Sequence, residues 1–191
     1  AHTSAVYDDV VKGYEVGYRH VTHFYNAMGG FHNVREYKQE GTVESVYLID
    51  GMTVEVIADG IHVPIPLLKL VYKIKGVEGT ALCTDGLSCS AGDENMYLDP
   101  RFIIENGVCK LADRSALAGS VATMDRLIRT MVNEAGVTLF DAVRMSSETP
   151  ARIMGVFDRK GSIKAGKDAD MCIYDADLNL KGVIAYGKKV V

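Results

Sequence analysis

Three histidines and one aspartate stand where short apolar runs of the sequence end: His2, His23, His62 and Asp85. Imidazole and carboxylate are ligand types that bind zinc or ferrous iron while leaving a coordination position open for water. We therefore expect His2 and His23 to hold a divalent metal, and Asp85 to take a proton from the activated water and return it to a leaving amine. The alternative is that each histidine only closes a loop or satisfies a backbone carbonyl.

Two cationic side chains near these residues can bind an anion. His62 follows an Asp-Gly turn and can donate a hydrogen bond to an anionic group of a substrate. Arg35 lies in a polar loop after the His23 run, where a guanidinium can hold a phosphate through two parallel hydrogen bonds. A solvated loop arginine is the alternative for Arg35.

Small and polar residues beside these groups offer further contacts. Asn26 and Ala27 follow His23 and can present side-chain or backbone donors to ligand oxygens, although Asn before a glycine turn is also typical of turns alone. Small residues at 118–120 precede a predicted helix, and backbone N–H groups at such a position are free to contact a ligand. A plain helix start is the alternative for this segment.

Apolar strands and amphipathic helices alternate along residues 1–155, which predicts an α/β fold. We expect strands within 20–28, 46–51, 53–60 and 80–86, and helices at about 6–18, 64–75, 119–135, 139–145 and 150–155. Each strand run finishes in polar residues, and a (β/α)8 TIM-type barrel carries its catalytic groups at the carboxyl ends of its strands. The pattern therefore predicts about half of such a barrel. A doubly wound sheet is the alternative, but no glycine-rich phosphate motif follows a strand.

Local signals refine these elements. Thr3 or Ser4 can cap the first helix, and Thr138 can cap the helix that begins at 139. Asn106-Gly107 predicts a β-hairpin inside a polar excursion between 91 and 114. Short alternating runs with turn glycines then predict a separate β segment over residues 156–191.

Composition narrows the class of partner. The formal charge is -4 with both signs interspersed, so no basic face is expected and nucleic acid and anionic membranes are excluded as partners. Apolar stretches are far shorter than the roughly 20 residues of a membrane helix. The four cysteines form no CxxC pair and are expected to be reduced thiols of a cytoplasmic protein. The first residues lack the features of a signal peptide, and we expect them to belong to the middle of a longer chain.

Seven motifs occur in an order and spacing similar to those of the N-acetylglucosamine-6-phosphate deacetylases of the amidohydrolase superfamily. They are AHTSA, THFYNAM, IADGIHV, CTDG, LAGSVATMDR, SSETPARIMG and GSIKAGKDADMCIYD. The resemblance spans essentially the whole chain. The motifs IADG-H and TH-YNAM are quite specific within the superfamily, whereas G-I-GK-AD is shared by many amidohydrolases.

The resemblance implies hydrolysis of the acetamide of N-acetylglucosamine 6-phosphate to glucosamine 6-phosphate and acetate. It implies a divalent metal, preferably zinc with iron as the alternative, held by His2 and His23, and it implies Asp85 as the catalytic acid and base. The small-molecule partner is then a phosphorylated amino sugar. The implied substrate contacts are Asn26, Ala27, Arg35, Ala58, Asp59, Gly60, Ile61, His62, Leu117, Ala118 and Gly119, with Arg35 and His62 serving the phosphate.

Members of this family are typically homodimers with a β-sandwich domain built from both chain ends, so residues 156–191 would form one part of it. The family also supplies a metal-binding Glu upstream of the AHTSA motif, which this sequence does not contain. The loop REYKQEG lacks the family's proline, and CTDGLSCSAG replaces a more alanine-rich sequence. Another amidohydrolase reaction, such as cyclic-amide hydrolysis or deamination, and a catalytically inactive fragment are therefore the alternatives.

Overall fold

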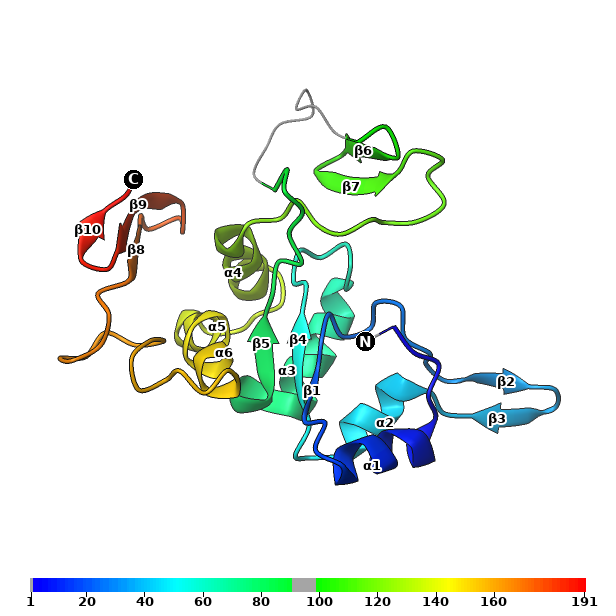
Figure 1. Ribbon diagram of the computed structural model, residues 1–191. Coiled ribbons are helices and arrows are strands. Elements are labelled where there is room, and N and C mark those ends of the chain that lie inside the picture. Colours follow the sequence, from blue (N-terminus) through cyan, green and yellow to red (C-terminus); the bar gives the residue numbers. More distant parts are fainter. Residues whose placement is uncertain (1, 91–98) are drawn as a thin grey trace.

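Three parallel strands form the central sheet of the molecule. The computed structural model describes residues 2–90 and 99–191. In the sheet, β4 (Thr53–Val56) lies between β1 (His20–Val21) and β5 (Thr80–Leu82). The chain passes through α2 (Thr42–Leu48) between β1 and β4, and through α3 (Ile65–Gly79) between β4 and β5 (Figure 1). Parallel strands joined by helices confirm the α/β class.

The alternation of β4 sets the two faces of this sheet. Val54 and Val56 are fully buried and belong to the hydrophobic core, whereas Thr53 and Glu55 lie on the opposite, partly exposed face. The core face is covered by α3 and by helices α4 (Met124–Asn133) and α5 (Leu139–Ser146). The Glu55 carboxylate therefore lies on the face away from the core helices.

Two expectations about the first part of the chain are wrong. Residues 46–51 are not a strand, because Val46 lies in α2, which begins after Gly41 and whose Glu44 carboxylate accepts the Gly41 N–H at 2.9 Å. The apolar run was too short to separate a strand from a buried helix by its periodicity. Neither Thr3 nor Ser4 caps a helix: α1 (Tyr7–Glu15) follows Val6 without a side-chain cap.

The later helices follow the sequence more closely. Thr138 caps α5 as expected, since its hydroxyl accepts the backbone N–H of Asp141 at 3.1 Å. Helix α6 (Glu148–Ile153) begins two residues before the expected start at Pro150, which therefore lies in its first turn, where a proline is tolerated. No helix among the described residues combines the length and apolar character that a membrane crossing requires.

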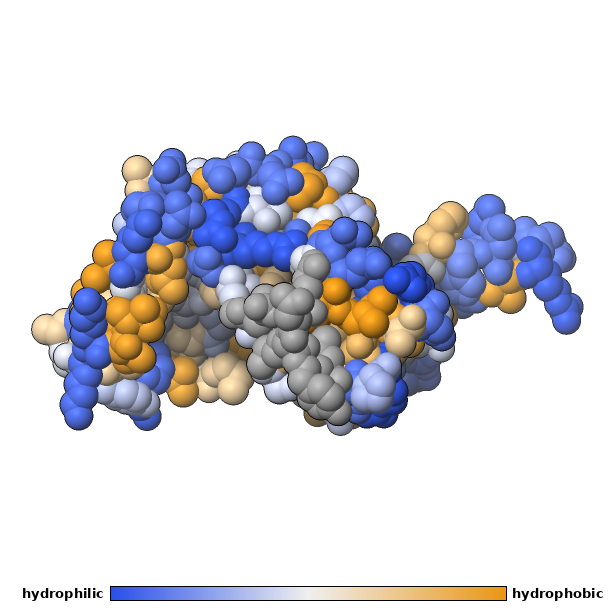
Figure 2. Space-filling view, turned by 90° about the horizontal axis from the view of Figure 1, so that it is seen from above, coloured by the Kyte–Doolittle hydropathy of each residue, from blue (hydrophilic) through white to orange (hydrophobic). Residues whose placement is uncertain are grey.

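Two antiparallel hairpins extend from the sheet. The expected hairpin around Asn106-Gly107 is confirmed as β6 (Phe102–Glu105) and β7 (Val108–Leu111). The structure adds an unexpected one, β2 (His32–Val34) and β3 (Tyr37–Gln39), whose exposed residues project to one side of the molecule (Figures 1 and 2). Its turn contains Arg35, which was expected in a polar loop.

The last part of the chain forms a small antiparallel sheet in the order β10-β9-β8. Its strands are β8 (Met171–Tyr174), β9 (Leu180–Ala185) and β10 (Lys188–Lys189), which confirms the expected β structure after residue 155. Most of its side chains are at least partly exposed. The assignment of 156–191 to a separate domain stays a prediction.

Candidate active site

His2 and His23 are brought together by a short backbone bridge. Thr3 pairs with Met28, donating its N–H to the carbonyl of Ala27 at 3.0 Å and accepting the N–H of Gly29 at 3.0 Å. This pairing holds the segment of His2 beside the turn that follows β1. The two imidazole rings lie 5.1 Å apart between centroids with their planes at 54°.

The two imidazoles fit part of a metal site. The Nδ1 atom of His23 is buried and has no hydrogen-bond partner within the described part of the chain, so it is free to coordinate. The neighbouring ring of His2 is exposed. No group of three or more His, Cys, Asp or Glu side chains that could hold a metal occurs among residues 2–90 and 99–191. Since catalytic zinc usually has three protein ligands, this pair is an incomplete set.

Glu55 on β4 supports the turn of His23 and was missed by sequence reasoning. Its carboxylate contacts His20 Nε2 at 3.4 Å, accepts the Thr22 hydroxyl, and accepts the His23 backbone N–H at 3.4 Å. The hydrogen bond with His20, opposed by burial and aided by Thr22, lowers the pKa of Glu55 to about 2. Glu55 is therefore ionised at neutral pH, and the alternation of β4 was the only signal for it.

Several residues of the candidate site have left-handed backbone conformations that only glycine adopts readily. The φ angles are 31° at His23, 78° at Tyr25, 53° at Ala27, 56° at Arg35 and 47° at Asp85. Such conformations in other residues carry about 1–3 kcal/mol of strain each and concentrate at functional sites. The turns after β1 and β5 are thus strained where the sequence places candidate chemistry.

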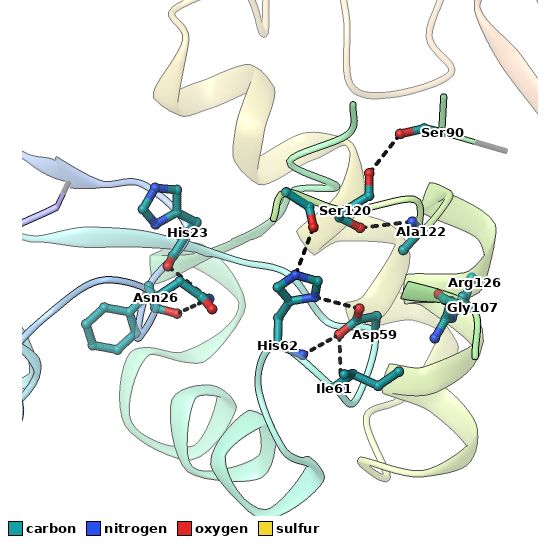
Figure 3. A network of polar contacts seen from close by, with 12 residues as sticks. His23, Asn26, Asp59, Ile61, His62, Ser90, Gly107, Ser120, Ala122 and Arg126 are labelled. Carbon is teal, nitrogen blue, oxygen red and sulfur yellow. Dashed lines mark hydrogen bonds and ion pairs between the residues drawn. The ribbon is translucent and has the colours of Figure 1, made fainter. Parts of the chain in front are cut away.

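His62 joins two loops at the carboxyl ends of the strands (Figure 3). Its Nδ1 lies 2.7 Å from Asp59 Oδ2, and its Nε2 lies 3.2 Å from the carbonyl oxygen of Gly119. The other oxygen of Asp59 accepts the N–H groups of Ile61 and His62 at 2.9 and 2.8 Å. The segments 59–62 and 117–119, both expected to contact substrate, therefore lie side by side.

The charges of this pair support each other. Burial lowers the pKa of His62, but the hydrogen bond and charge of Asp59, the carbonyl of Gly119 and the charge of Asp85 outweigh it, so the pKa is raised overall. Burial raises the pKa of Asp59, but hydrogen bonds from the His62 ring and from the Ile61 and His62 amides lower it overall. Both groups are stabilised in their charged forms.

Asp85 is tied by its backbone to the same region. Its carbonyl accepts the N–H of Ser120 at 3.0 Å, and the carbonyl of Ser120 accepts the N–H of Leu87 at 3.0 Å. The Asp85 residue itself is exposed. The backbone N–H groups at 118–120 were expected to be free for a ligand, but the Ser120 N–H is occupied by the Asp85 carbonyl, and this link between loops distant in sequence was not predicted.

Residues 1–190 match the amidohydrolase family. The chain belongs to this family. It is 33% identical over 185 residues to an N-acetylglucosamine-6-phosphate deacetylase of Bacillus subtilis, covering 96% of this chain and 45% of the relative. It is 29% identical to an N-acetylgalactosamine-6-phosphate deacetylase of Escherichia coli O157:H7, covering 98% of this chain and 48% of the relative.

A solved structure of N-acetylglucosamine-6-phosphate deacetylase from Pasteurella multocida superposes with a TM-score of 0.89 at 28% identity, covering 99% of this chain and 49% of that one. The resemblance inferred from the motifs is therefore confirmed. The chain spans about half the length of the curated relatives it matches.

Within this amidohydrolase-family chain, the remaining predicted substrate contacts have different environments. The side-chain amide of Asn26 donates to the carbonyls of His23 and Phe24, so its nitrogen stabilises the turn. Ala58 is fully buried, whereas Ile61 and Leu117 are exposed. Arg35 lies in the turn of the β2–β3 hairpin, which projects away from the β1-β4-β5 sheet (Figure 1).

Proposed function

We propose that this chain belongs to an enzyme that removes the acetyl group from an N-acetylhexosamine 6-phosphate, with N-acetylglucosamine 6-phosphate as the expected substrate. The observation that carries the proposal is the pairing of His2 with His23, together with Asp85 among the loops that follow the sheet strands. The relatives named for the glucosamine and galactosamine substrates support the substrate class. The reaction would release acetate and the free amine.

Different residues of the chain would bind the metal, transfer the proton and attract the anionic substrate. His2 and His23 would hold a divalent metal, for which we prefer zinc to iron, and such an ion polarises a carbonyl and activates water. The Asp85 carboxylate takes a proton from the attacking water and delivers it to the amine nitrogen as the amide bond breaks. His62 places a positive charge near Asp85, in the region where we expect the anionic substrate.

We further infer that the β1-β4-β5 sheet is part of a (β/α)8 barrel and that residues 156–191 are part of a small β-sandwich domain. The parallel order of the strands and their helical crossovers support this architecture. A cytoplasmic homodimer is the proposed state of the whole protein.

The test is acetate release by the protein that contains this chain, supplied with zinc and each of the two N-acetylhexosamine 6-phosphates. General acid–base catalysis contributes roughly 10²–10⁴-fold, so Asp85→Asn should lower kcat by at least about 100-fold. Asp113→Asn is the matched control, because its carboxylate is exposed and bonds only Ser115 among the described residues.

Each outcome has a separate meaning. Undiminished turnover in Asp85→Asn would remove Asp85 from the reaction. No acetate from either substrate would refute the deacetylase function. Equal rates with and without the substrate phosphate would favour a different amidohydrolase reaction, such as cyclic-amide hydrolysis or deamination.

A further inference from the structure

Asp59 is enclosed by its own loop. Only 1% of its side chain is exposed, and both carboxylate oxygens are occupied. One oxygen accepts the N–H groups of Ile61 and His62, and the other faces His62 Nδ1 at 2.7 Å. This carboxylate has no surface left for a ligand, so any effect that it has on a bound molecule must pass through His62.

Both ring nitrogens of His62 face hydrogen-bond acceptors. Nδ1 meets the Asp59 carboxylate and Nε2 meets the Gly119 carbonyl oxygen at 3.2 Å. A neutral imidazole has one N–H donor, so one of these contacts would set a lone pair against an oxygen. Asp59 already accepts two backbone N–H groups and has a lowered pKa, so its carboxylate is ionised, and then only the imidazolium satisfies both contacts of His62. With 4% of its side chain exposed, the ring needs the charge of Asp59 to remain protonated.

The second contact of His62 leads to the Asp85 turn. Gly119, with a φ of 61°, presents its carbonyl to His62, and the next residue, Ser120, donates its N–H to the Asp85 carbonyl. The segment 117–120 therefore lies between the imidazolium and the strained turn of Asp85. A change in His62 protonation alters the hydrogen bond to the Gly119 carbonyl. The neighbouring Ser120 N–H holds the Asp85 carbonyl.

We propose that Asp59 is a positioning residue that keeps His62 as a doubly hydrogen-bonded imidazolium, and that this pair fixes segment 117–120 against the Asp85 turn. The inference rests on the proposed function only where it treats Asp85 as the proton carrier. It assigns Asp59 an indirect role in place of the substrate contact implied by the family resemblance.

The other charges around the pair leave this assignment intact. Asp85 is the further carboxylate that acts on His62. Arg126 and Arg129 of α4, together with Glu134 directly after that helix, line the hollow beside Asp59. Arg129 is paired with Asp125 at 2.7 Å, and Arg126 donates to the Gly107 carbonyl at 2.9 Å. No ion pair joins Asp59 to either arginine among the residues that the structure describes.

The first test is the NMR titration of His62 in the isotope-labelled protein, with and without Asp59→Asn. In the unaltered protein we expect both ring nitrogens to carry protons at neutral pH. The Asn variant keeps the shape but not the charge, and we expect its His62 proton-binding constant to fall by at least tenfold. Glu134→Gln is the matched control, because Glu134 lines the same hollow and makes no hydrogen bond or ion pair with His62 in the described part of the chain.

A single protonated ring nitrogen at neutral pH in the unaltered protein would overturn the proposal, and so would an unchanged titration in Asp59→Asn. The unaltered protein alone provides the first of these results, so the proposal remains testable even if the variant does not fold. The NMR arms need no substrate. Failure of acetate release would therefore refute the proposed function without touching this inference.

The second test measures positioning through hydrogen exchange of the Ser120 amide. That N–H bonds the Asp85 carbonyl, so we expect it to exchange at least tenfold faster in both Asp59→Asn and His62→Gln than in the unaltered protein. The Asp141 amide, capped by Thr138 on α5, serves as the internal reference. Equal loss of protection at both amides would indicate general destabilisation and would overturn the positioning role, as would unchanged exchange at Ser120.

Discussion

Gly41→Ala should destabilise the protein by about 3 kcal/mol, because this residue touches the backbone that brings His2 and His23, the candidate metal ligands, together. A Cβ at Gly41 would lie 2.3 Å from the carbonyl oxygen of Gly29 and 2.7 Å from the N of Gly30. Backbone atoms must then move. Overpacking typically costs about 1–3 kcal/mol, and the displaced Gly29 also bonds Val43 and Thr3, at roughly 1 kcal/mol for each bond weakened.

Urea unfolding of both proteins measures the difference directly. Gly13→Ala is the matched control: it lies inside α1 with no atom within 4 Å of its added Cβ, so it should stabilise the protein by about 0.5–1 kcal/mol. A Gly41→Ala protein as stable as the unaltered one would refute the close approach of α2 to Gly29. Destabilisation by Gly13→Ala of the same size would show that the effect is not specific to this contact.

Three further predictions concern the site and the core. The raised pKa of His62 contributes stability that is fully present below about pH 6.5 and is lost as the pH rises through the folded-state pKa. The lowered pKa of Asp59 contributes stability that is fully present above about pH 4 and is lost as the pH falls through the folded-state pKa. The stability difference between the unaltered protein and Asp59→Asn in urea should therefore be largest between those limits; a difference independent of pH would contradict it. Thr138→Ala should lower the free energy of unfolding by about 1 kcal/mol through the lost α5 cap, while Thr138→Ser should retain most of it. Leu127→Ala, at a fully buried position of α4, should cost about 2–5 kcal/mol in the same assay, and a value under 1 kcal/mol would contradict its place in the core.

The sequence predicted elements best where local chemistry determines them. The strand at Thr53–Val56 alternates cleanly, and the β6–β7 hairpin has the Asn-Gly pair that such turns favour. The β2–β3 hairpin turns instead at Arg35 and Glu36, which have no such signature, and Arg35 adopts a φ of 56°. Helix α2 was missed because burial against the core, which is decided by distant residues, determined its conformation.

In the candidate site, too, residues marked by their own chemistry were predictable, whereas residues that act through distant contacts were not. The types and order of His2 and His23 were sufficient to predict that they lie together, because side-chain chemistry and family motifs mark them, whereas the role of Asp85 beside them stays a prediction. Glu55, and the link that Ser120 makes between two loops, could not be found in this way. Glu55 acts on the backbone of a turn 32 residues away, and Ser120 joins two loops through main-chain bonds that any residue with an N–H could form.

The strained turns explain why the supporting residues are as important as the reactive ones. A left-handed residue such as His23 would relax in an isolated peptide, because its Cβ disfavours that conformation. In the folded chain, the Glu55 carboxylate accepts the His23 N–H, and the Ser120 N–H donates to the Asp85 carbonyl. The Asp59–His62 pair then holds the chain next to Ser120. The positions of the candidate catalytic groups are therefore determined by neighbouring loops and by the pairing of β1 with β4, which form only when the sheet has assembled.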